Sequence, residues 1–370
     1  MTITTEKLRQ YAESVGLDLF GVANIERFKD APPRMHPAAI MPEAKSVIVV
    51  GKRILRGGWR GIEEGTYWPS YTYFDYSGLL NSFFIPFGSY HLACYLEDHG
   101  WEATPYYPGV PERQMNRKPL RQGSVPHNVH LAIRIAGVAA GVGEIGWSKV
   151  FLTKEFGPRQ RLHAVITDAP LEPTPLVKPG TICNRCMECV RGCPGAIPHL
   201  REGKTVKIQI EGENYEWADV DMGKCTLMYH GGDPRTSPFL HKDFPGWKFD
   251  VTEQEVSEGA AYKFSWTLSG AKWAPSEEFP SGYVVEGHAM LMKWGMGEQE
   301  SSSFGVEGSR GCMRSCFNYL EKTGRIKSRF HNGEFIKRPR WLLPSKTQPL
   351  TKEQVEAYRA ADEGRTDDEQ

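Results

Sequence analysis

The sequence predicts a mixed fold of α-helices and β-strands, followed by a separate cysteine-rich part that binds metal. Three observations lead to this fold class. Short apolar stretches typical of strands alternate with helical patterns over the first 168 residues. A proline-rich connector, APLEPTPLVKPG, then occupies residues 169–180 and indicates a domain boundary. The run CNRCMECVRGCP follows that connector directly.

The first elements are clear in the pattern. Residues 3–16 predict a helix with a threonine cap and Gly16 as its stop. The segments DLFGVANI (18–25) and SVIVVGKRI (46–54) are rich in branched apolar residues and predict buried strands. An irregular aromatic stretch at 58–76 precedes a predicted helix over about 77–99.

The second half of this region continues the mixed order. WEATPYY (101–107) predicts a strand, and residues 123–146 predict an apolar helix that runs into a glycine-rich turn. VFLTKEF (150–156) and LHAVITD (162–168) predict a pair of strands.

The cysteine run carries the most specific chemical signal. Cys183, Cys186, Cys189 and Cys193 have the spacing C-x2-C-x2-C-x3-C-P, which is typical of bacterial-type iron–sulfur sites. A zinc ribbon sets its two CxxC pairs farther apart, so the spacing favours a cubane cluster. In two-cluster ferredoxins the fourth cysteine serves the other cluster. The run therefore predicts electron transfer and further cysteine ligands.

Four more cysteines lie outside the run. Cys225, Cys312 and Cys316 follow it and are the candidates for further ligands, although free cysteines are also often simply buried. Cys94 lies in an apolar helical pattern and is expected to be a small buried residue.

The composition indicates the compartment in which the protein works and the partners it lacks. The 370 residues contain 45 basic and 45 acidic residues, so no overall field favours nucleic acid or an anionic membrane. No apolar run approaches the roughly 20 residues that span a bilayer, and no targeting segment is recognisable. We expect a cytoplasmic protein without a membrane partner, in which cysteines bind metal rather than form disulfides.

The glycine-rich turn spells a dinucleotide-like motif. Gly141, Gly143 and Gly146 form G-x-G-x-x-G, and Asp168 follows about twenty residues later. The dinucleotide fingerprint must leave a strand and open a helix, whereas here a helical pattern precedes the glycines. The alternatives are a tight turn with positive φ, or close backbone approach to another large, flat cofactor.

The order of these motifs resembles one enzyme superfamily. AGVGEIGWSKVFLTKEFGPRQRLHAVITDAPL followed by CNRCMECVRGCP is similar to the reductive dehalogenases and epoxyqueuosine reductases. The resemblance covers residues 85–235 well and 305–320 in part. It implies an α+β protein with a nitroreductase-like core that holds cobalamin in its base-off form, beside a ferredoxin-like domain with two 4Fe-4S clusters. The absence of a D-x-H-x-x-G stretch agrees with base-off binding.

The resemblance also implies domain boundaries. The core is expected at residues 1–175, the iron–sulfur domain at 176–320 with a tryptophan-rich insertion at about 226–300, and a C-terminal extension with an acidic tail at 321–370.

Family ligand sets can be carried over residue by residue. The first cluster is implied to use Cys183, Cys186, Cys189 and Cys316, and the second Cys193, Cys225 and Cys312. The remaining family cysteine would stand at position 309, where this chain has Ser309, and the proline after the last cysteine is replaced by Phe317. The second cluster is thus expected to be atypically ligated, by serine, histidine or solvent, to be a 3Fe-4S cluster, or to be absent.

The resemblance further implies a proton donor and a cation near a small organic substrate. Tyr76 best matches the dehalogenase tyrosine, with Tyr73 and Tyr71 close behind, and Arg159 in FGPRQR matches the family GPR segment. The simpler alternatives are packing aromatics and a structural arginine. Tyr106 and Tyr107 are candidate cofactor contacts, at the place where epoxyqueuosine reductases carry an aspartate.

These features predict a cobalamin- and iron–sulfur-dependent oxidoreductase, reductive dehalogenase-like, that receives electrons from ferredoxin or flavodoxin. One alternative is a ferredoxin-like electron carrier or an activator of a separate corrinoid protein. The other is an epoxyqueuosine reductase-like or flavin-binding reductase. The missing aspartate and the balanced charge make a nucleic-acid substrate the weaker expectation.

Overall fold

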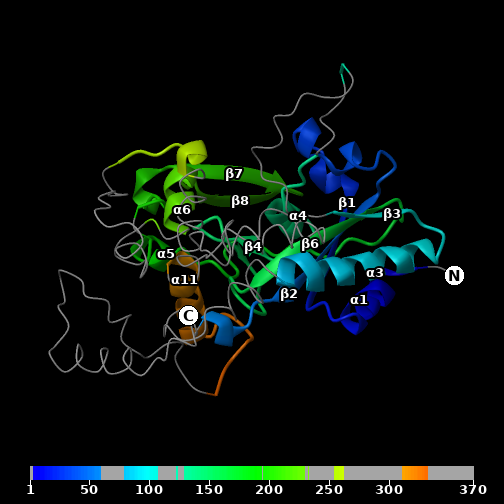
Figure 1. Cartoon of the computed structure of the whole chain (residues 1–370), viewed down its shortest axis with the longest axis horizontal. Helices are drawn as coiled ribbons and strands as arrows, with labels where there is room; N and C mark the ends of the chain where they lie inside the picture. The colour runs from blue at the N-terminus through cyan, green and yellow to red at the C-terminus, as the bar shows by residue number, and fades with distance from the viewer. Residues whose placement is uncertain are drawn as a thin grey trace, which may run out of the picture.

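The computed structural model describes residues 3–59, 79–106, 122–123, 129–193, 195–229, 232, 254–261 and 311–331. Figure 1 shows a twisted central sheet with helices on both sides and a second, smaller group of elements beside it. The expected class, a mixture of helices and strands, is confirmed. Most of the predicted insertion and the acidic tail lie outside the described residues.

The main sheet has four antiparallel strands in the order β1-β2-β6-β3. Their bounds are Leu19–Asn24 for β1, Ser46–Arg53 for β2, Gln160–Thr167 for β6 and Ala103–Tyr106 for β3. The long helices are α1 (Thr5–Ser14) and α3 (Ile85–Glu97), and the π-helical turn η5 (Leu80–Phe84) precedes α3. The short helix α4 spans Ile133–Ala139.

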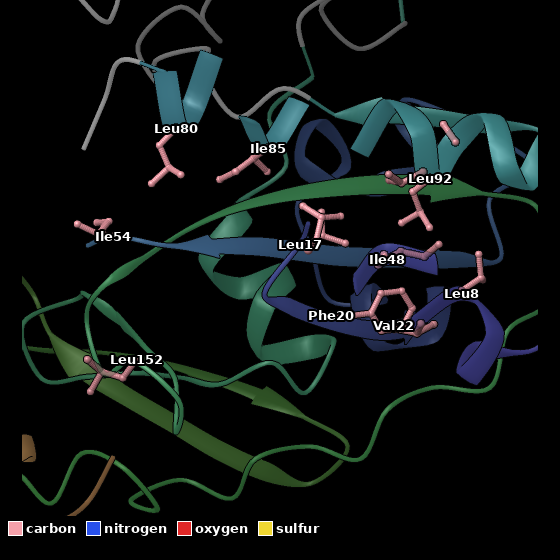
Figure 2. Close-up of a cluster of buried hydrophobic side chains, with 14 of the residues drawn as sticks. Leu8, Leu17, Phe20, Val22, Ile48, Ile54, Leu80, Ile85, Leu92 and Leu152 are labelled. Atoms are coloured by element: carbon pink, nitrogen blue, oxygen red, sulfur yellow. The ribbon is translucent and has the colours of Figure 1, made fainter. Parts of the chain in front are cut away.

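Both faces of this sheet are covered, because successive strand residues point to opposite sides. Ile48 and Val50 pack with α1 and α3, whereas Val47 and Val49 pack with α4. Figure 2 shows the first of these clusters, where side chains of α1 and α3 meet those of the sheet. This arrangement explains why β1 and β2 read as nearly continuous apolar runs.

Helix boundaries follow local chemistry. Thr4 caps α1 through the backbone N–H of Lys7, and Gly16 takes a positive φ of 84° just past its end, as predicted. The helix predicted at 77–99 is regular only from Ile85, beside Pro86, which is favoured in a first helical turn. Cys94 on α3 is partly exposed, so the expectation of a buried residue was wrong.

One predicted pairing was wrong. The short strand β5 (Phe151–Leu152) pairs with β4 (Glu144–Ile145). Strand β6 instead lies between β2 and β3. Six of the last seven residues of β6 are buried, as expected of a strand inside a sheet whose two faces are both covered.

The cysteine-rich part contains smaller elements around a third hydrophobic cluster. These elements are α5 (Glu188–Arg191), the 3-10 turn η7 (Leu200–Glu202), β7 (Thr205–Ile210), β8 (Glu213–Ala218), α6 (Met222–Tyr229) and α11 (Cys312–Lys322). Strands β7 and β8 form an antiparallel hairpin. Trp147, Met187, Ile197 and Met228 lie at the centre of the cluster, and several cysteines pack against it.

Within the described ranges, no helix combines the length and the apolar character that crossing a membrane requires.

Candidate iron–sulfur site

Three separate segments bring seven cysteines together. The cysteine run leads into and out of α5, α6 carries Cys225, and α11 carries Cys312 and Cys316. Helices α5 and α11 pack against each other, and the three helices gather at one end of the molecule in Figure 1. A Cβ atom on Gly192 would lie 2.3 Å from the hydroxyl oxygen and 3.1 Å from the Cβ of Ser315, so glycine favours this close approach.

The backbone of the run has an unusual conformation. Arg185 and Met187 adopt positive φ values of 57° and 61°, which side chains other than glycine rarely take. Such residues persist only where the surroundings hold them, and they gather at functional sites. Here they lie between Cys183 and Cys189 and turn the chain so that these thiols face a common interior.

Cys183, Cys186, Cys189 and Cys316 form the first thiol group. Burial raises the pKa of Cys316 well above its ordinary value, and the nearby thiols of Cys183, Cys189 and Cys186 raise it further. Burial likewise raises the pKa of Cys189 to about 12, again with Cys183 and Cys186 beside it. Residues more than a hundred positions apart are therefore neighbours.

Cys193, Cys225 and Cys312 form the second thiol group. Burial raises the pKa of Cys225 to about 11, with a further contribution from Cys193. The pKa of Cys312 is raised well above its ordinary value by burial and then by Cys193, by Cys225 and by Cys189 of the first group, which lies nearby. Ser309, which stands where a fourth ligand is expected, lies outside the described residues.

The surroundings of both groups suit iron–sulfur clusters. The backbone N–H of Trp147 donates to the Cys183 sulfur at 3.4 Å, and the backbone N–H of Ala196 donates to the Cys193 sulfur at 3.3 Å. Hydrogen bonds to sulfur and burial are the features by which proteins tune such clusters. Among the described residues, no three His, Cys, Asp or Glu side chains converge as a single metal ion would require. A cubane cluster bonds its thiolates to four different irons, so its cysteines need not converge on one point as the ligands of a single ion do.

A pocket of about 320 Å³ opens beside the first group. Trp147, Arg185 and Tyr215 line it, together with Cys183 itself. Arg185 lies over the Trp147 ring, 5.5 Å from its centre, and forms an ion pair with Glu216. The first group is therefore reachable from the surface on this side.

The glycine-rich turn lies next to the site, and protein atoms fill the space at each glycine. A Cβ at Gly141 would lie 2.2 Å from the Pro175 carbonyl oxygen, and one at Gly143 would lie 2.0 Å from that of Leu152. At Gly146 it would meet the Leu152 side chain at 2.7 Å. The turn leads from α4 into the β4–β5 hairpin, not from a strand into a helix, so the dinucleotide fingerprint is not formed. A cofactor role for these glycines stays a prediction.

Arg159 is a buried cation that lies between the end of β2 and α11. Only 2% of it is exposed, and its guanidinium donates to the Ile54 carbonyl and, at 3.0 Å, to the Ser328 hydroxyl. It also lies over the ring of Phe317, 4.7 Å from the centre. Arg159 thus contacts the residue next to Cys316 and the segment that leads into residues 60–78.

Of the candidate tyrosines, the structure describes Tyr106. Tyr106 is buried, its hydroxyl accepts the Leu131 N–H at 3.0 Å, and burial raises its pKa to about 12. Tyr106 therefore belongs to the core of the sheet. Tyr71, Tyr73, Tyr76 and Tyr107 lie outside the described residues, and their proposed roles rest on the sequence.

Two charged residues at the site were missed by the sequence analysis. Glu144 and Arg325 both hydrogen-bond the loop that enters the cysteine run. Glu144 is the single acidic residue between positions 129 and 153, within an apolar stretch, and such an isolated acid signals a buried partner. Nothing in the sequence around Arg325 distinguishes it from the neighbouring basic residues.

No protein-family model matches the chain. The curated relatives are reductive dehalogenases, which confirms the resemblance predicted from the motifs. The tetrachloroethene reductive dehalogenase of Desulfitobacterium hafniense is 31% identical over 163 residues, covering 40% of this chain and 30% of the relative. That of Dehalobacter restrictus is 30% identical over the same length and shares. That of Sulfurospirillum multivorans is 33% identical over 94 residues, which are 24% of this chain and 18% of the relative. The matched part thus spans 30% or less of these relatives.

Solved structures of both branches of the superfamily also match. A catabolic reductive dehalogenase aligns with a TM-score of 0.40 and 15% identity, covering 80% of this chain and 37% of that one. An epoxyqueuosine reductase in complex with a tRNA stem loop aligns with a TM-score of 0.40 and 16% identity, covering 84% and 79%.

Proposed function

We propose that the chain is an iron–sulfur- and cobalamin-dependent oxidoreductase, reductive dehalogenase-like, that acts on a small organic substrate. The observation that carries this proposal is the gathering of seven cysteines from three segments of the chain, with Cys316 near the run and Cys312 near both the run and Cys225. This gathering supports the ligand sets that the family resemblance implies. The relatives named tetrachloroethene reductive dehalogenase support an oxidoreductase of this kind.

The residues of this chain have distinct proposed roles. The two thiol groups would hold the clusters, and the N–H groups of Trp147 and Ala196 would stabilise negative charge on sulfur. The pocket beside Cys183 is the proposed approach for a ferredoxin or flavodoxin donor. Cobalamin, when bound, would supply a reduced cobalt centre for the substrate.

Arg159 and Tyr76 are the proposed groups on the substrate side. Arg159 is held against Phe317 and against the Ile54 carbonyl, four positions before the aromatic stretch 58–76 begins. A cation there would stabilise the tyrosinate that remains after Tyr76 donates a proton. This assignment of Tyr76, with Tyr73 as the alternative, rests on the family resemblance.

The proposed architecture is a nitroreductase-like core over residues 1–175 and a ferredoxin-like domain over 176–320. This division rests on the family resemblance, and the hydrophobic clusters cross it, since Phe317 packs in the first cluster and Trp217 in the second. We propose a cytoplasmic location on the grounds of cysteine use alone.

Anaerobic purification with metal analysis and an absorption spectrum tests the proposal. We expect about one cobalt per chain with a base-off corrinoid band, and about seven or eight irons, seven indicating a 3Fe-4S second cluster. About four irons would indicate a single cluster. Iron without cobalt would favour an electron carrier, and iron with flavin a flavin-binding reductase. A chain that takes up no iron would contradict the proposal.

A further inference from the structure

The loop Gly180–Cys183 is the entrance to the cysteine run, and its N–H groups converge on one carboxylate. Glu144 accepts hydrogen bonds from the backbone of Gly180 at 2.7 Å, of Cys183 at 2.6 Å and of Ile182. Only 2% of Glu144 is exposed. Both of its carboxyl oxygens accept, which is the arrangement that an ionised carboxylate satisfies best.

The carbonyl groups of the same loop converge on one guanidinium. Arg325 donates to Ile182 at 3.1 Å, to Thr181 at 3.1 Å and to Gly180 at 3.2 Å. The planar fork of arginine can serve several acceptors at once, which the single ammonium of lysine cannot do with the same geometry. Three consecutive residues are therefore held from both sides.

The two charged residues come from different parts of the fold. Glu144 begins β4 in the glycine-rich turn, whereas Arg325 follows α11, the helix that carries Cys312 and Cys316. Gripping the loop from both sides therefore fixes Cys183 relative to Cys316, its distant partner in the first thiol group. Burial raises the pKa of Glu144, whereas the three backbone N–H groups and the positive charge of Arg325 favour its ionised form.

We propose that Glu144 and Arg325 form a charged clamp that positions Cys183 for the first cluster and sets the reduction potential of that cluster from opposite sides. This inference rests on the proposed iron–sulfur function. Both are positioning residues, since they act through the loop and through their charge, not by ligating iron.

The charges have opposite consequences for reduction. A cluster that takes up one electron from dithionite becomes more negative by one unit, so a nearby carboxylate disfavours the reduced state and a guanidinium favours it. Glu144→Gln should therefore raise the midpoint potential of the first cluster, and Arg325→Gln should lower it. A clamp that merely stiffened the loop would move both potentials in the same direction or not at all.

The experiment is a dithionite titration of the iron-loaded chain followed by electron paramagnetic resonance, together with hydrogen–deuterium exchange over residues 176–186. Glu144→Gln, Arg325→Gln and the double variant are compared with the wild type. Glu155→Gln is the control, because it removes the same charge from a partly exposed ion pair with Lys327. Glu144→Asp keeps the negative charge on a shorter side chain. Arg325→Lys keeps the positive charge but replaces the guanidinium fork with a single ammonium group.

We expect opposite shifts for the two single variants, a near-wild-type potential for the double variant and no shift for Glu155→Gln. Each of the two singles should speed exchange in the loop by about tenfold or more, since buried hydrogen bonds are lost. Arg325→Lys and Glu144→Asp should speed exchange with little change in potential, and they provide the readout if a glutamine variant does not retain iron.

Shifts of the same sign, or unchanged exchange in the loop of an iron-loaded variant, would overturn the clamp and leave the proposed function standing. A wild-type chain without iron would overturn the proposed function, and with it the effect on potential.

Discussion

Substitution of Phe317 tests how α11 packs against the rest of the protein. This residue follows Cys316, it is completely buried, and it stands where the family resemblance implies proline. Its ring contacts Trp59 edge-on at 5.7 Å between centres and receives the Arg159 guanidinium at 4.7 Å. One side chain therefore joins α11 to the sheet core and to the segment before residue 60.

The magnitude can be estimated from these contacts. Phe317→Leu keeps most of the volume but loses the aromatic pair and the cation–π contact, which together are worth about 1–3 kcal/mol. Phe317→Ala adds a cavity and should lower the free energy of unfolding by about 3–5 kcal/mol. Because Phe317 neighbours Cys316, both variants should also release iron from the first group faster.

Urea unfolding of the iron-loaded protein under anaerobic conditions measures these differences. Leu55→Ala is the matched control, because Leu55 is 56% exposed and its truncation should cost no more than about 0.5 kcal/mol. If Phe317→Ala lowers the free energy of unfolding no more than Leu55→Ala does, the packing of α11 on Trp59 and Arg159 is contradicted. If the leucine and alanine variants are equally destabilised, the aromatic contacts matter and the cavity does not.

Three further predictions follow from the described residues. Gly143→Ala should destabilise by about 1–3 kcal/mol through overpacking, whereas Gly57→Ala, with nothing within 4 Å of its new Cβ, should change little; equal unfolding midpoints would contradict the close approach. Tyr106→Phe should cost about 1–3 kcal/mol, because the buried Leu131 N–H loses its acceptor; an added loss of cobalt would support a cofactor contact, and an unchanged stability would argue against the hydrogen bond. Burial lowers the pKa of His163 to about 3, so the folded state resists a proton that the unfolded state takes up near pH 6.5. The stability from neutral His163 is full above that pH and should fall by up to about 1.4 kcal/mol per unit as pH drops toward 3, and His163→Gln should flatten this acid limb in urea titrations.

Much of the fold was predictable because local signals agree with it. The cap at Thr4 and the stop at Gly16 define α1, and the branched apolar runs define β1 and β2. The neighbours of β6 were not predictable, since a run that is buried on both faces carries no alternation to show which strands flank it.

The same contrast holds at the site. The spacing of the run and the isolated cysteines predicted which seven thiols lie near one another. Their assignment to two clusters comes from the family resemblance and stays a prediction. The clamp was hidden, because Glu144 and Arg325 meet only through a loop that is remote from both in the sequence. The isolation of Glu144 in an apolar stretch indicates a buried partner but not which one, because hydrogen bonds to backbone groups leave no pattern in the partner's side chains.

Iron analysis of paired cysteine variants distinguishes the two proposed clusters. We expect Cys316 to ligate the first cluster and Cys225 the second. Cys316→Ser should remove or convert one cluster and leave the signal of the other, Cys225→Ser should do the reverse, and Cys94→Ser on α3 should change neither. Loss of the same signal in both Cys316→Ser and Cys225→Ser, with the other signal intact, would contradict the account.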